Sequence, residues 1–304
     1  MNKTIAIAIH GGAGTLDKAG MTVPMKLAFE AGLRQAVTAG HDILKNGGSA
    51  LDAVEAAVMA LEDDTLFNAG RGAVLTSEGR HEMDAAIMDG ATLAAGAVAG
   101  VYRIKNPVVL ARKVIDNSKY VFLAGKGAMQ FAADQGVATE PDAYFFTEHR
   151  LEELKKDQEE EKGLAPEKFG TVGAVAIDAM GNLAAATSTG GLTNKRYGRV
   201  GDTPLIGAGT YANNATCAVS CTGEGEQFIQ AVMAYDISCL MEYKGLSLQE
   251  AASTAMNGKL RKVMGSGGFI AVDKNGHIHM EFNTEGMYRA SICGNDEPFI
   301  AIFE

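Results

Sequence analysis

The most constraining feature of the sequence is a pair of apolar segments of the same length and layout. The first runs from Ala174 to Thr189 with a turn at 178–182, and the second runs from Gly268 to Asn283 with a turn at 274–276. Asp, Asn and Gly between two apolar runs are typical of β-hairpins. Small side chains dominate the first segment, so we expect a second layer of structure to pack closely against it.

Helical periodicity fills the regions between the strands. A helix from Pro24 ends at Gly47-Gly48, and Ser49 is placed to cap a second helix that runs to about Asp63. Before them, a buried strand from Ile5 to Ile9 enters a glycine loop, where the backbone must approach another group closely. Strands grouped around collected helices favour a layered α+β fold with mainly antiparallel sheets, in the order helix–sheet–sheet–helix. Further helices are expected near 107–117, 125–136, 224–243 and 247–264.

Composition restricts the classes of partner. The formal net charge is −10, with 27 basic against 37 acidic residues, which argues against nucleic-acid binding. The apolar run Ile5–Ile9 is too short for a signal-peptide core, and the uncharged stretch 204–223 is too polar for a membrane span. The four cysteines match neither a zinc cluster nor a disulfide framework. We therefore expect a soluble cytoplasmic protein with free thiols and a small-molecule partner.

Several weaker motifs have simpler explanations. The loop His10–Gly14 lacks the third glycine of a dinucleotide-binding fingerprint, since Asp17 stands at that position. His277 and His279 could hold a metal from one face of a strand, but no third ligand is implied and a polar surface strand explains them better. Acidic pairs such as Asp63-Asp64 or Glu82 with Asp84 are common on solvated surfaces.

Three threonines beside glycines are more informative. The segment 151–162 is almost wholly charged and forms the one clear composition break, so it is expected to be a solvated helix or a mobile linker. Thr171 follows this segment, at the start of a buried strand, which is an unusual place for a hydroxyl that only packs. Thr189 and Thr222 each end another apolar run. Spacing alone does not bring the three together.

The wider motifs resemble the plant-type L-asparaginase and isoaspartyl peptidase family. The resemblance extends over nearly the whole chain with all segments in family order, and Thr65, often proline in relatives, is a minor departure. The resembling segments are 170–176, 187–191, 198–204 and 207–212, together with 10–14, 61–64, 66–72, 83–85 and 88–90.

This resemblance implies an N-terminal-nucleophile fold, a four-layer αββα sandwich forming a single domain over 1–304. It implies self-cleavage between Gly170 and Thr171 into an α subunit, 1–170 with a mobile linker at about 151–170, and a β subunit, 171–304. The implied assembly is a homodimer of cleaved αβ heterodimers. The implied substrates are β-aspartyl dipeptides and L-asparagine, with no nucleic acid or membrane involved.

The resemblance also assigns roles to residues. Thr171 is the nucleophile of both self-cleavage and catalysis, and Thr189 orients it. The Thr222 hydroxyl and the Gly223 N–H form the oxyanion hole, and Gly223 also contacts substrate. Three further residues serve the substrate: Arg199 binds the α-carboxylate, Asp202 binds the α-ammonium, and Asn68 lies at the pocket edge.

No catalytic cofactor is implied, but the resemblance does imply a structural sodium ion. Its ligands would be backbone carbonyls of Leu61, Glu62, Asp64, Phe67, Ala69 and Arg71. Aspartylglucosaminidases and threonine-aspartases share the implied fold and nucleophile and remain alternatives. The lack of a secretion signal and the sequence of residues 187–191 argue against an aspartylglucosaminidase. An uncleaved, non-catalytic binding protein of the same fold is the third alternative.

Overall fold

The computed structural model describes residues 4–14, 18–160 and 170–304 and contains two packed β-sheets. The larger sheet has the order β12-β11-β1-β5-β6-β2-β3-β4 and the smaller has the order β10-β9-β8-β7. Neighbouring strands are antiparallel except for the parallel pair β3 and β4. The strands are β1 (Ala6–Gly14), β2 (Met83–Asp89), β3 (Ala95–Val101), β4 (Phe122–Ala124), β5 (Val172–Ile177), β6 (Leu183–Thr189), β7 (Thr210–Ala212), β8 (Cys217–Gly223), β9 (Gly267–Asp273), β10 (Ile278–Phe282), β11 (Gly286–Cys293) and β12 (Phe299–Ala301).

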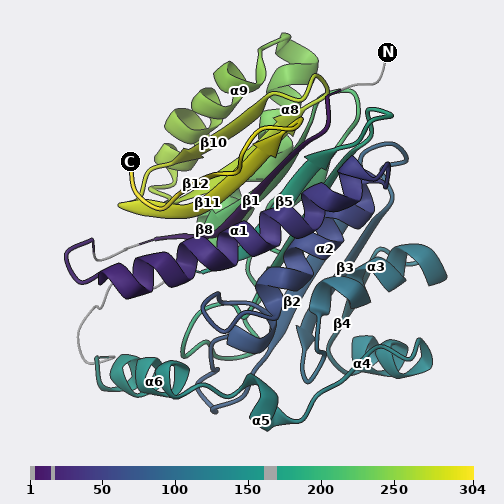
Figure 1. Ribbon diagram of the computed structural model, residues 1–304. Helices are drawn as coiled ribbons and strands as arrows, with labels where there is room; N and C mark the ends of the chain where they lie inside the picture. The colour runs from purple at the N-terminus through teal and green to yellow at the C-terminus, as the bar shows by residue number, and fades with distance from the viewer. Residues whose placement is uncertain (1–3, 15–17, 161–169) are drawn as a thin grey trace.

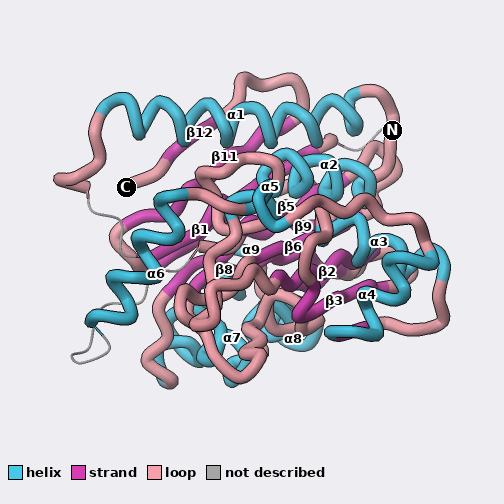
Figure 2. The backbone as a smooth tube through the Cα atoms, turned by 90° about the horizontal axis from the view of Figure 1, so that it is seen from below, coloured by secondary structure: helices cyan, strands magenta, loops and turns pink. Residues whose placement is uncertain are grey.

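Helices cover the outer face of each sheet, as Figures 1 and 2 show. On the larger sheet, α1 packs on β1 and β11, α2 on β5 and β6, and α3 on β2 and β3. On the smaller sheet, α8 and α9 pack on β8 and β9. The helices are α1 (Val23–Lys45), α2 (Ala50–Glu62), α3 (Pro107–Asn117), α4 (Gly125–Asp134), α5 (Asp142–Phe145), α6 (Glu148–Glu160), α7 (Gly225–Ala231), α8 (Met233–Lys244) and α9 (Leu248–Ala255), with a 3-10 turn at Gly70–Gly72 and a π turn at Met256–Leu260.

Three buried clusters match the expected four layers. One lies between the larger sheet and α1–α3, a second between the smaller sheet and α7–α9, and a third between the two sheets. In the third, Ala8 and Ala185 of the larger sheet share a cluster with Ala218 and Ile270 of the smaller one. Small side chains allow this close approach of the sheets. The predicted αββα sandwich is confirmed.

Some element boundaries differ from the prediction. The helix expected over 224–243 is two helices, because Val232 adopts a left-handed conformation with φ of 50°. The first turn of α8 is held instead by the loop between β6 and β7: Ala234 N–H donates to the Ala208 carbonyl and Tyr235 N–H to the Gly207 carbonyl. The pairing of β11 with β1 was not foreseen. In the charged segment, 151–160 belong to helix α6, whereas 161–169 lie outside the described residues.

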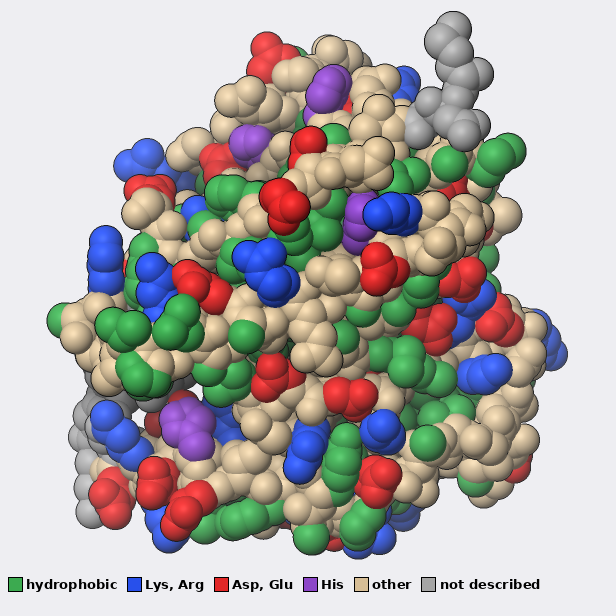
Figure 3. Space-filling model, in the orientation of Figure 1, with side chains coloured by type: hydrophobic (Ala, Val, Ile, Leu, Met, Phe, Trp, Pro, Cys, Tyr) green, Lys and Arg blue, Asp and Glu red, His purple; other side chains and the backbone are tan. Residues whose placement is uncertain are grey.

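The free thiols agree with the expectation from the sequence. Figure 3 shows acidic and basic side chains interspersed over the face that it presents. No helix in the described ranges is long and apolar enough to cross a bilayer. All four cysteines are free, and Cys217 and Cys221 are buried.

Candidate active site

Thr171 and Thr189 meet because their strands pair. Antiparallel β5 and β6 place Val172 opposite Ser188, so the residue before β5 lies beside the last residue of β6. Oγ1 of Thr171 donates a hydrogen bond to Oγ1 of Thr189 at 3.1 Å. The Thr189 hydroxyl donates in turn to the Gly170 carbonyl oxygen at 3.2 Å, and it accepts from the Gly191 N–H at 2.9 Å. One hydroxyl therefore contacts both the candidate nucleophile and the candidate scissile peptide.

The glycine loop at the end of β1 packs against the same peptide. Gly12 has φ of +113°, and an ideal Cβ there would lie 3.0 Å from Cα of Gly170 and 3.4 Å from N of Thr171. Any side chain would strain the loop and press on the Gly170–Thr171 bond. The next residue, Ala13, donates its N–H to Oγ1 of Thr222 at 3.2 Å. Because that oxygen accepts from Ala13, the Thr222 hydroxyl hydrogen is free to point elsewhere.

His10 is a site residue that the sequence analysis missed. It is fully buried, and its Nδ1 lies 2.9 Å from the Thr171 carbonyl oxygen while its Nε2 lies 2.9 Å from Oγ of Ser220. Burial lowers the pKa of His10 to about 3, so the ring is neutral. The carbonyl can only accept, which puts the proton on Nδ1 and makes Nε2 an acceptor from Ser220. The polar chain continues to Thr187, whose Oγ1 is 2.6 Å from Ser220, and to Thr210.

Predicted substrate-binding residues converge on the same point. A small cleft with about 10 Å³ of free space, room for about one water, lies at Thr171. Asp202 is 4% exposed, and its Oδ2 has no hydrogen-bond partner among the described residues. Burial raises the pKa of Asp202 to about 7. The cleft is lined by Gly170, Thr171, Thr189, Gly191, Leu192, Arg199, Gly201, Asp202, Thr203 and Gly223.

Asn68 and Thr222 lie next to this cleft rather than in its lining. The Asn68 Nδ2 donates to the Gly191 carbonyl at 2.8 Å, and its Oδ1 accepts from the Val74 N–H at 3.0 Å. An ideal Cβ on Gly170 would lie 2.9 Å from Cβ of Asn68. Asn68 thus supports the turn after Thr189 and touches the residue before Thr171. Thr222 directly precedes the lining residue Gly223.

The loop after α2 brings carbonyl groups against two glycines. An ideal Cβ at Gly70, where φ is +51°, would lie 2.4 Å from the Glu62 carbonyl oxygen. One at Gly72 would lie 2.1 Å from the Phe67 carbonyl oxygen. Only glycine allows the chain to return this close to the carbonyls. Such oxygens are the ligand type that a hard cation binds.

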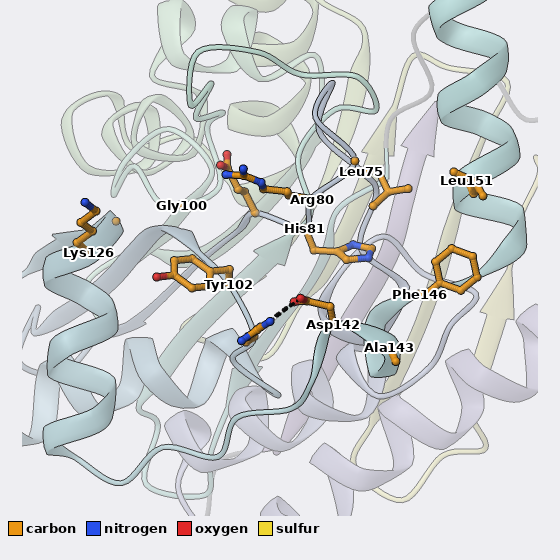
Figure 4. Close-up of a pocket in the computed structure, with 14 residues that line it drawn as sticks. Leu75, Arg80, His81, Gly100, Tyr102, Lys126, Asp142, Ala143, Phe146 and Leu151 are labelled. Atoms are coloured by element: carbon orange, nitrogen blue, oxygen red, sulfur yellow. Dashed lines mark hydrogen bonds and ion pairs between the residues drawn. The ribbon is translucent and has the colours of Figure 1, made fainter.

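The histidine pair considered from the sequence and a second cavity lie apart from the three threonines. His277 and His279 pair with Asp273 at 3.0 Å and Glu281 at 2.9 Å, and the described residues contain no group of three or more His, Cys, Asp or Glu that could hold a metal. A larger cavity of about 760 Å³ lies between Leu75, Tyr102 and α5 and contains none of the three threonines (Figure 4). Arg103 and Asp142, which form an ion pair, both line this cavity.

Comparisons with known proteins agree with the resemblance drawn from the motifs. Residues 3–302 match the family model described as Asparaginase. The isoaspartyl peptidase of Escherichia coli (strain K12) is 51% identical over an alignment that covers 100% of this chain and 97% of that protein. The probable isoaspartyl peptidase/L-asparaginase 2 of Arabidopsis thaliana is 43% identical, with 98% and 99% covered. The isoaspartyl peptidase/L-asparaginase of Homo sapiens is 46% identical, with 89% and 87% covered.

Proposed function

Because the chain belongs to the asparaginase family, we propose that it cleaves itself before Thr171 and then hydrolyses β-aspartyl amide bonds in β-aspartyl dipeptides and L-asparagine. The family model and the relatives confirm the resemblance drawn from the motifs. This family is one of N-terminal-nucleophile hydrolases. The observation that supports this reading best is the shared hydroxyl of Thr189, bonded to the Thr171 hydroxyl at 3.1 Å and to the Gly170 carbonyl at 3.2 Å.

These contacts support a route for self-cleavage. The Thr171 oxygen attacks the Gly170 carbonyl carbon while the Thr189 hydroxyl hydrogen-bonds the carbonyl oxygen, which becomes negative in the transition state. The C–N bond breaks, the proton lost from Oγ1 of Thr171 is transferred to the Thr171 nitrogen, and an ester joins the two residues. Water then hydrolyses the ester to a Gly170 carboxylate and a free Thr171 hydroxyl. Gly170 is itself one of the residues that line the cleft.

The new terminus supplies its own base. A threonine hydroxyl is a weak nucleophile, but a free α-amine with an ordinary pKa of about 8 lies beside it after cleavage. The neutral amine accepts the hydroxyl proton as the oxygen attacks the substrate carbonyl. In this proposal the Thr222 hydroxyl and the Gly223 N–H stabilise the oxyanion, a role in which one donor contributes about 2.7–4 kcal/mol. The leaving amine departs, and water hydrolyses the acyl-threonine.

The polar lining favours an aspartyl substrate. Arg199 offers a planar fork for the α-carboxylate, and the unpartnered Oδ2 of buried Asp202 offers an acceptor for the α-ammonium. With both α-groups held, only the side-chain β-carbonyl remains to meet Thr171. Ammonia or a whole amino acid can then be the leaving group.

Two further features, an ion site and an assembly, belong to this proposal. The carbonyl oxygens packed against Gly70 and Gly72 support a structural sodium ion held by the loop from Leu61 to Arg71. We also propose the homodimer of cleaved heterodimers. Thermal unfolding tests the sodium site, because the protein should melt at a higher temperature in a sodium salt than in a tetramethylammonium salt. Sedimentation tests the homodimer.

A denaturing gel and three substrates test the proposed function. The purified protein should separate into chains that end at Gly170 and begin at Thr171. It should turn over β-Asp-Leu and L-asparagine, with negligible turnover of α-Asp-Leu, whose α-carboxylate is consumed in the amide. An intact, inactive chain would instead indicate the non-catalytic binding protein. Faster hydrolysis of a glycosylated asparagine, or cleavage after aspartate within a protein, would favour the aspartylglucosaminidase or threonine-aspartase alternative.

A further inference from the structure

Arg199 is held by a carboxylate outside the cleft. Its Nε donates to Oε1 of Glu226 at 2.8 Å and its Nη2 donates to Oε2 at 2.7 Å. These bonds occupy the side edge of the guanidinium. The other edge, formed by Nη1 and the second hydrogen of Nη2, makes no hydrogen bond within the described part of the chain and can take another planar acceptor. Arg199 lines the cleft, whereas Glu226 is not among its lining residues.

The backbone confines the guanidinium on two sides. An ideal Cβ at Gly201 would lie 2.8 Å from Nη1 of Arg199, and one at Gly225 would lie 2.7 Å from Nη2. The Gly225 position is also 3.0 Å from Oδ1 of Asp202. Arg199 and Asp202 are therefore near neighbours, although no ion pair between them is formed among the described residues.

This arrangement presents a competition between two carboxylates for one cation. Asp202 is buried with Oδ2 unpartnered, so it would gain from the Arg199 guanidinium. Glu226, on the first turn of α7, takes the bidentate edge instead. The hydrogen bonds from Arg199 hold the pKa of Glu226 below its usual range, so this carboxylate stays ionised.

We propose that Glu226 is a positioning residue for substrate recognition. It draws Arg199 away from Asp202, fixes the guanidinium with its free edge toward the cleft, and leaves Asp202 open for the α-ammonium. This inference rests on the proposed function and names a residue that sets its specificity. Without Glu226, Arg199 and Asp202 pair with each other and both substrate contacts weaken.

The test compares two substrates in matched variants. The substrates are β-Asp-Leu and the same dipeptide with the aspartyl α-carboxylate converted to an amide. Glu226→Ala should raise KM for β-Asp-Leu about tenfold, the scale of one charged hydrogen bond, and change kcat less than about twofold. It should also reduce the preference for the carboxylate substrate. Glu226→Gln keeps one acceptor and should be intermediate. Asp142→Ala, which removes the same kind of bidentate partner from Arg103, should match wild type.

A double-mutant cycle separates positioning from a structural role. In an Arg199→Ala background, removing Glu226 should cost no further affinity. An equal loss of affinity on removal of Glu226 with and without Arg199, or an unchanged carboxylate preference, would overturn the proposal. Turnover of β-Asp-Leu by the wild type would still leave the proposed function standing. Absence of wild-type turnover would be a failure of the function itself. Gels confirm maturation of each variant, and if Glu226→Ala does not mature, Glu226→Gln decides by the same comparison.

Discussion

The hydroxyl of Thr189 accepts a hydrogen bond from the hydroxyl of Thr171 at 3.1 Å and donates one to the carbonyl oxygen of the peptide that precedes Thr171. The hydroxyl hydrogen of Thr171 thus points toward the Thr189 hydroxyl, which is itself hydrogen-bonded to the carbonyl of the peptide to be cleaved. The Gly191 N–H, bonded to the same Thr189 oxygen at 2.9 Å, fixes this hydroxyl. The same pair can orient Thr171 before and after cleavage.

Removal of the Thr171 hydroxyl should abolish maturation. Thr171→Ala is expected to remain one full-length chain, because the attacking oxygen is gone. Thr171→Ser should cleave, but more slowly, since the rotamer is no longer restricted by the methyl group. Denaturing gels over time measure both. Cleavage of the alanine variant at Gly170 would disprove self-cleavage by this hydroxyl.

Thr189→Val should slow self-cleavage by on the order of tenfold or more, because the shape is kept while the bonds to Thr171 and Gly170 are lost. Thr189→Ser should retain most of the rate. Thr216→Val is the matched control: it removes another buried hydroxyl, bonded to Ser238, far from the cleft lining. If Thr189→Val and Thr216→Val matured at the same rate, the Thr189 hydroxyl would have no role in cleavage.

Arg199→Lys should lower kcat/KM for β-Asp-Leu by about 1.5–3 kcal/mol, since a lysine keeps the charge but not the planar fork. Arg103→Lys changes an equivalent fork at the exposed pair with Asp142 and serves as its control. Steady-state kinetics give both values. An Arg199→Lys enzyme of undiminished efficiency would remove Arg199 from the carboxylate site and leave the Thr171 chemistry intact.

Substrate affinity should depend on pH through Asp202. Burial raises the pKa of this carboxyl to about 7, and only its ionised form attracts the α-ammonium. KM for L-asparagine is therefore expected to rise as the pH falls through 7, whereas kcat follows the Thr171 amine. Asp202→Asn should raise KM at every pH and flatten this dependence. A wild-type KM that is constant from pH 6 to 8 would contradict the assignment.

Stability should depend on pH through Glu62. Burial raises its pKa in the folded chain to about 8, above an unfolded value near 4.5, so the folded state holds the proton more tightly. This stabilisation is complete below pH about 4.5 and is lost as the pH rises toward 8. In the uncleaved Thr171→Ala chain, adding Glu62→Gln should reduce the fall in unfolding free energy between pH 5 and 8. Urea titrations measure the slope, and equal slopes would refute the buried-acid assignment.

Local chemistry in the sequence determined the individual elements. Ser49 caps α2 by accepting from the Asp52 N–H at 3.1 Å, and the hairpin of β5 and β6 turns at Asp178 as expected. These features depend on residues within a few positions of one another, which is why they could be predicted. The motif resemblance likewise identified Thr171, Thr189, Arg199 and Asp202, and the structure brings these four to one cleft.

Only the tertiary structure decided which distant groups meet. His10 reaches the Thr171 carbonyl across 161 positions of sequence because β1 pairs with β5 on one edge and β11 on the other. Glu226 reaches Arg199 because α7 begins directly after β8. An isolated histidine or glutamate in the sequence carries no record of its partner, since burial and packing between separate elements select that partner. The sequence therefore determined most of the strands and helices and, through the motif resemblance, pointed to Thr171, whereas the packing of the two sheets determined the surroundings of Thr171.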